Sequence, residues 1–182
     1  PKKIKTELIK QREIFKNKNL FDNDTVQKEK KIKEIKDFNN FLHKSSSYYS
    51  AILNQGFENE DINNSFFRLE TLGKIETFLP LYLAILNNKK FKPEFLININ
   101  EILEAFTIRV FIFGNKKGNT GNSALFELAY KVFTNKINFT ELKKELRTLI
   151  DKNNNNLDLK KSIINISVYN TISQSALKLI LL

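Results

Sequence analysis

The 182-residue chain contains no cysteine, methionine or tryptophan. The absence of cysteine excludes several kinds of chemistry. No disulfide can form, no thiolate can bind a metal, and no thiol can act as a nucleophile. A reducing compartment is compatible with this composition, and we expect a cytoplasmic protein.

Histidine is almost as scarce, since His43 is the only one. A Ser-His-Asp triad would have to be built on it, and no nucleophile-elbow motif accompanies it. A lone histidine also makes neither a metal site nor half of a catalytic dyad. Glu101 and Glu104 are the only close acidic pair on an apolar helix, and they have no metal-binding companion. We predict no catalytic residue, no metal site and no cofactor in this chain.

Long hydrophobic runs are also missing. The longest, Phe78–Leu86, falls far short of the roughly 18 residues that span a bilayer, and there is no signal peptide. We therefore expect no membrane partner. The chain starts at Pro1 and stops at Leu182 inside an apolar helical run. That pattern favours a fragment of a larger multidomain protein.

The apolar residues that are present have the spacing of helices, and the stretch from Thr77 to Asn122 organises the rest. Its first helix is predicted over Thr77–Asn88, with Thr77 as the N-cap and Pro80 in the first turn. The residues after Pro80 are apolar on every face, which indicates a helix buried on all sides.

A second helix is predicted from Pro93 to Gly114, because apolar residues recur at intervals of three and four as far as Phe113. Arg109 is the one basic residue in its apolar run. One interpretation is that its stem packs while its head reaches a carboxylate or the surface. The other is that it is held toward a ligand or a neighbouring domain.

The remaining segments are also helical by pattern, and none shows sustained strand alternation. Further helices are predicted over Lys2–Lys18, from Asp24 or Thr25 to Gln55 with Gly56 as the C-cap, over Asn59–Leu72, over Ser123–Asn135, over Glu141–Asp151 capped by Thr140, and once or twice within Leu157–Leu182. Lys152–Asn156 has the composition of a low-complexity linker. We predict an all-α fold, an irregular bundle of about seven to nine helices without a sheet, in a single domain over residues 1–182.

The net charge is +10, and only four of the 30 basic residues are arginine. Residues 1–44 hold 13 basic against 7 acidic residues. A basic N-terminal quarter could approach phosphate. A chain shaped to bind phosphate would be expected to use more arginine, whose planar fork binds it bidentately. A solvated surface is therefore the favoured interpretation, and nucleic-acid contact is the alternative.

The segment Gly114–Gly121 reads as a loop with three glycines and two lysines. The Walker spacing is absent and no strand precedes it, which argues against a P-loop. It leads into a helix that starts near Asn122 or Ser123, and helix N-termini attract anions. A flexible connector is the alternative. The candidate nucleic-acid or anion contacts are Arg109, Lys116, Lys117 and Asn119.

The motifs of the chain follow one another in a recognisable order. A long lysine-rich helix ends in YYSAIL, and after it come FFRLETLG, TFLPLYLAIL, EFLININEILEAFTIRVFIFGNKKGNTG, SALFELAY and LKLILL. This order resembles the helical region of GmrSD-type restriction proteins over residues 26 to 182. The most telling match is Arg109, four residues before Phe113-Gly114. The family pattern often has a second arginine next to the first, where this chain has Val110.

The resemblance implies a parent protein with an N-terminal nucleotide-binding domain carrying a DGQQR motif and a C-terminal HNH nuclease, acting in defence against foreign DNA. Neither motif is present here, so the chain would be the non-catalytic helical connecting module. Its partners would be the neighbouring NTPase and nuclease domains, and DNA. The resemblance predicts an exposed hydrophobic face on the C-terminal helix and Arg109 near the Gly114–Gly121 loop. The alternative is a free-standing helical DNA- or protein-binding module with a closed core and a continuous basic face.

Overall fold

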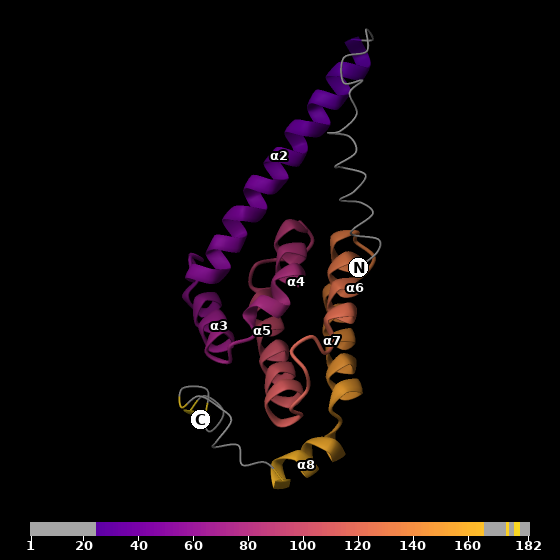
Figure 1. The fold of residues 1–182 in the computed structure, drawn as a ribbon. Coiled ribbons are helices and arrows are strands. Elements are labelled where there is room, and N and C mark those ends of the chain that lie inside the picture. Colours follow the sequence, from indigo (N-terminus) through magenta and orange to yellow (C-terminus); the bar gives the residue numbers. More distant parts are fainter. Residues whose placement is uncertain (1–24, 166–173, 175–176, 179–182) are drawn as a thin grey trace. The chain divides into compact units, whose positions relative to one another are not determined.

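A computed structural model describes residues 25–165, 174 and 177–178 of the chain (Figure 1). In this part every regular element is a helix and there is no strand, which confirms the all-α class. The elements are α2 (Thr25–Asn54), α3 (Glu60–Thr71), α4 (Ile75–Asn87), α5 (Phe95–Phe106), the π-helix η1 (Thr107–Phe113), α6 (Asn122–Phe133), α7 (Phe139–Asn153) and α8 (Asn156–Asn165). These seven α-helices are the lower limit of the predicted range. The helix predicted over Lys2–Lys18 lies outside the described residues.

The chain divides into two compact units, Pro1–Tyr48 and Tyr49–Leu182. In the first unit, the described residues all belong to α2. Its apolar residues keep the predicted helical spacing, with Ile35 and Phe38 half-buried and Ile32 50% exposed. Lys30 and Lys33 are exposed on the polar face, and His43 is an exposed surface residue.

The end of α2 differs from its prediction by one residue. The left-handed backbone conformation at this end belongs to Gln55, with φ of 53°, and not to Gly56. The Gly56 N–H then donates to the Ala51 carbonyl at 2.9 Å, which closes the last turn. A left-handed residue with a side chain costs roughly 1–2 kcal/mol. The Gln55 side chain donates to Glu70 Oε2 at 2.8 Å, and this bond helps to offset the cost.

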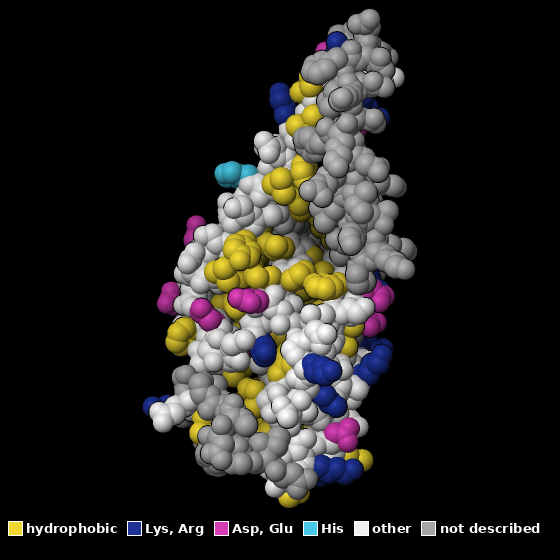
Figure 2. All heavy atoms as spheres, viewed as in Figure 1, with side chains coloured by type: hydrophobic (Ala, Val, Ile, Leu, Met, Phe, Trp, Pro, Cys, Tyr) yellow, Lys and Arg dark blue, Asp and Glu magenta, His cyan; other side chains and the backbone are white. Residues whose placement is uncertain are grey.

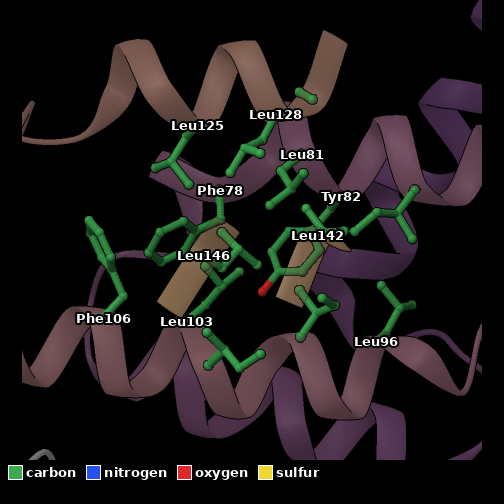
Figure 3. Close-up of a cluster of buried hydrophobic side chains, with 14 of the residues drawn as sticks. Phe78, Leu81, Tyr82, Leu96, Leu103, Phe106, Leu125, Leu128, Leu142 and Leu146 are labelled. Atoms are coloured by element: carbon green, nitrogen blue, oxygen red, sulfur yellow. The ribbon is translucent and has the colours of Figure 1, made fainter. Parts of the chain in front are cut away.

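The core of the second unit lies between α3, α4, α5, α6 and α7. α4 packs against α6, and α5 packs against both α3 and α7. Figure 3 shows leucine and phenylalanine side chains converging from α4, α5, α6 and α7. The largest fully buried side chains are those of Tyr82, Phe66, Phe78 and Phe106. The prediction that α4 is buried on all sides was wrong, because Leu79, Leu83 and Leu86 are only partly buried and form a half-exposed side of the helix.

Two predicted helix starts were wrong. α4 begins at Ile75, so Pro80 lies inside the helix and not in its first turn. Thr77 is not the N-cap because Ile75, two residues before it, is itself buried in the core and lies in the helix. α7 begins at Phe139, where Asn138 and Glu141 form a reciprocal capping box, so Thr140 is not the cap. A box that satisfies two backbone N–H groups outcompetes a single threonine cap.

Two further predictions fail at the ends of α6 and α7. The helical spacing over Ser123–Asn135 also places Phe133 on the buried face, but its side chain is 52% exposed, whereas Val132 beside it in the last turn is fully buried. The predicted linker Lys152–Asn156 is mostly helical, since α7 continues to Asn153 and α8 starts at Asn156. Asn154, between the two helices, is only 2% exposed.

Candidate functional site around the π-helix

The site begins where α5 changes from an α-helix to a π-helix. The spacing of apolar residues predicts one helix to Gly114, but the α-helix ends at Phe106 and Thr107–Phe113 is the wider η1. The Gly114 N–H donates to the Arg109 carbonyl five residues back, at 2.9 Å. Phe106 and Phe111, also five residues apart, make an edge-to-face contact with ring centroids 5.5 Å apart. π-Helical turns are rare and occur frequently at functional sites.

Arg109 points its guanidinium group at the junction between α7 and α8. Its Nη2 atom donates to the Asn154 carbonyl at 2.8 Å and to Asn156 Oδ1 at 3.0 Å, and it lies 3.4 Å from Asp151 Oδ1. The Arg109 side chain is 21% exposed. This geometry matches the first of the two interpretations, an arginine whose stem packs and whose head reaches a carboxylate. The last carbonyls of a helix attract a cation, so the position at the end of α7 is favourable.

Asn154 in turn binds the backbone of Arg109. Its side-chain amide donates to the Arg109 carbonyl, the same oxygen that accepts the Gly114 N–H. Each of the two residues therefore donates a side-chain hydrogen bond to the backbone carbonyl of the other. Sequence reasoning missed this residue because a run of four asparagines looks like a solvated linker. An asparagine between two helices is a signal for local capping, and nothing in the pattern marks one of the four as buried.

The Gly114–Gly121 loop leads into α6 as predicted, since α6 begins at Asn122. Gly121 has φ of 84°, and a Cβ there would lie 2.9 Å from Phe106 Cζ, so both conformation and space require glycine. Lys116, Lys117 and Asn119 are exposed. Among the predicted contacts, Arg109 meets the loop through its backbone bond to Gly114. Its guanidinium group binds Asp151, Asn154 and Asn156 at the α7–α8 junction.

A third lysine lies at this loop that sequence reasoning did not include. Lys74, just before α4, holds its Nζ atom 5.2 Å from the centre of the Phe111 ring. The same Nζ lies 3.8 Å from the position that a Cβ on Gly118 would occupy. The loop therefore carries positive charge from two separate segments of the chain, which sequence spacing could not reveal.

A buried polar network lies inside the bundle and was also missed. Tyr82 donates its hydroxyl to Asn100 Oδ1 at 2.6 Å, and Asn100 Nδ2 donates to Ser65 Oγ at 2.7 Å. Ser65 in turn donates to the Ile62 carbonyl at 2.7 Å. The network links α3, α4 and α5, and all three of its side chains are 0% exposed. Burial raises the pKa of Tyr82 well above its ordinary value of 10.0, so the hydroxyl remains protonated.

The acidic pair on α5 separates into two roles. Glu101 is exposed, whereas Glu104 is half-buried and receives a bond from Arg68 Nε at 3.0 Å. Burial raises the pKa of Glu104 above its ordinary value of 4.5, while the charge of Arg68 and its hydrogen bond oppose that rise. The Arg68–Glu104 ion pair joins α3 to α5, and its geometry is that of a structural contact between helices.

Charge on the rest of the described surface is mixed. In Figure 2, lysine and arginine side chains gather over α7, and acidic side chains lie over α3. Helix α7 itself alternates Lys144 and Arg147 with Glu145 and Asp151. Within residues 25–165, 174 and 177–178, no group of three or more His, Asp or Glu is placed to hold a metal ion. No helix in that part of the chain has the length and apolarity needed to cross a bilayer.

The arrangement around η1 links this helix to the α7–α8 junction, because the Arg109 guanidinium is shared among three acceptors there. Comparison of the sequence with protein-family models and with curated proteins, and of the fold with solved structures, finds no match.

Proposed function

We propose that this chain is a non-catalytic helical connecting module of a GmrSD-like, nucleotide-dependent restriction endonuclease that acts in defence against foreign DNA. The proposal rests on the order of motifs described above and on the all-α fold that carries them. Its partners would be an NTPase domain and an HNH nuclease domain of the same protein, in the cytoplasm.

The observation that carries the proposal is the apolar surface of α8. Leu157 is 70% exposed, Ile163 is 50% exposed and Ile164 is 82% exposed. Fully burying one such side chain is worth about 1.5–3 kcal/mol, so three on one short helix favour a docking surface. The resemblance predicts such a face on the C-terminal helix, most of which lies outside the described residues. We propose that α8 belongs to the same docking surface.

The Arg109–Asn154 pair supports a connecting role in a second way. Arg109 also binds Asn156, the first residue of α8, and η1 leads directly into the exposed loop that holds Lys116, Lys117 and Asn119. A domain docked on α8 would therefore sit on an element bonded to the helix that precedes this loop. We propose that the loop contacts DNA or another anion in the parent protein.

The test is restriction by the complete protein that contains this chain. Leu157→Glu together with Ile164→Glu should weaken docking and lower the restriction of phage plating by roughly tenfold or more, because interface energy concentrates in a few buried anchors. Lys161→Glu, which changes an exposed charged residue of the same helix and leaves the apolar side chains in place, is the control and should restrict normally. Unchanged restriction by the double variant would contradict docking through α8.

A further inference from the structure

The carbonyl of Arg109 is the point at which the π-helix is held. It accepts the Gly114 N–H at 2.9 Å and, on its other side, the side-chain amide of Asn154. The next carbonyl, of Val110, accepts the Lys116 N–H at 3.1 Å. In an α-helix the Arg109 carbonyl would accept the N–H of Phe113. The π form is the less common of the two, so bonds from outside the helix are needed to favour it.

Gly114 supplies the space for the Asn154 amide. Its φ of −75° is ordinary, so glycine is not needed there for conformation. A Cβ at this position would lie 2.9 Å from Asn154 Nδ2, 2.9 Å from the Arg109 carbonyl oxygen and 2.6 Å from that of Val110. The absence of a side chain at Gly114 therefore lets the amide reach the helix backbone.

We propose that Asn154 is a positioning residue that holds η1 in its π register. The Arg109–Asn154 pair makes η1 an element with two states, the π register and the α register. The choice between them couples the α7–α8 junction to the Gly114–Gly121 loop. Movement of the junction that withdraws the Asn154 amide returns Arg109–Phe113 to the α register. Because each residue of an α-helix turns by roughly 100°, a one-residue change reorients the chain that follows. The lysines of the loop then change position.

This coupling is a property of the residues of this chain, and it does not depend on the identity of a docked domain. The same two groups bias it from both sides, since Arg109 Nη2 binds the Asn154 carbonyl while Asn154 Nδ2 binds the Arg109 carbonyl. An element with two discrete hydrogen-bonding arrangements is the physical basis that coupling between two places requires.

The register can be read directly by NMR through the scalar coupling across a hydrogen bond. In the unmodified chain we expect coupling between the Gly114 nitrogen and the Arg109 carbonyl carbon. In Asn154→Ala it should be replaced by coupling between the Phe113 nitrogen and the Arg109 carbonyl carbon, the pair that an α-helix joins. Asn156→Ala is the matched control, because it removes one acceptor of Arg109 and leaves the Arg109 carbonyl untouched.

Persistence of the Gly114–Arg109 coupling in Asn154→Ala would overturn the proposal. If that variant does not fold, Asn154→Asp keeps the side-chain volume and removes the donor, and it should give the same change of register. If both variants fail to fold while Asn156→Ala folds, the α register is not an accessible state and the proposal is wrong.

Discussion

The bond between Tyr82 and Asn100 joins two helices in the core, and its removal has a calculable cost. Tyr82→Phe removes the hydroxyl and leaves Asn100 Oδ1 buried without its donor, which should lower the free energy of unfolding by about 1–3 kcal/mol. Asn100→Ala deprives the Tyr82 hydroxyl of its acceptor and also leaves a small cavity, so we expect about 2–4 kcal/mol. Ser65 loses one donor in this variant but keeps its bond to the Ile62 carbonyl.

The double variant separates this bond from general packing. Once both partners are gone, no buried group remains unsatisfied between them, so the double variant should be more stable than the sum of the single effects by about 1–2 kcal/mol. Urea unfolding followed by far-ultraviolet circular dichroism measures all three values. Tyr130→Phe, at a half-buried tyrosine outside the network, is the control and should change stability by less than about 0.5 kcal/mol. Additive single effects would refute the reasoning.

Three other predictions concern space, protonation and charge. Gly114→Ala should lower the free energy of unfolding by about 1–3 kcal/mol because its Cβ has no room, whereas Gly118→Ala, in the same loop but open, should stay within about 0.5 kcal/mol; equal denaturation midpoints would show that Gly114 has no steric role. Because the pKa of Glu104 is raised above 4.5 in the folded state, the folded state holds the proton longer than the unfolded state, so the contribution of Glu104 to stability falls as pH rises from about 4.5 through the folded pKa. Thermal unfolding of Glu104→Gln should lack that fall in stability, and identical pH profiles for the variant and the unmodified chain would rule out this contribution of Glu104. Replacing Lys116 and Lys117 by alanine should weaken duplex DNA binding uniformly across sequences and reduce the salt slope by about 0.9 for each lysine that contacts phosphate; fluorescence anisotropy between low and physiological salt measures it, and unchanged affinity would remove the loop from the DNA contact.

The helices themselves could be predicted because their apolar residues follow one period throughout. α3 matches its predicted bounds within a residue, with Asn59 capping its start and Ile62, Phe66 and Leu69 buried inside. The start of α6 after the glycine loop was likewise correct. These features depend on local pattern and capping, which the sequence states directly.

The ends of helices were less predictable because several residues compete to cap them. Asn138 and Thr140 both offer a side-chain oxygen, and only the partner Glu141 decides between them. At α4 the burial of Ile75 overrides the cap that Thr77 offers. A local capping box therefore decides the start of α7, and core packing decides the start of α4.

The π-helix and the buried networks could not be predicted from spacing at all. The turn at η1 depends on Asn154, which lies 45 residues from Arg109 in the sequence. Tyr82, Asn100 and Ser65 each occupy positions that helical periodicity marks only as inward-facing. The packing of three helices decides which of these inward-facing polar groups meet. The sequence alone does not show how the helices pack.

The most direct test of the central claim is the sequence of the gene on both sides of the segment that encodes residues 1–182. If this chain is the helical connecting module of a GmrSD-like protein, the same reading frame should encode a DGQQR motif before it and an HNH motif after it. A reading frame that contains neither motif would contradict the claim.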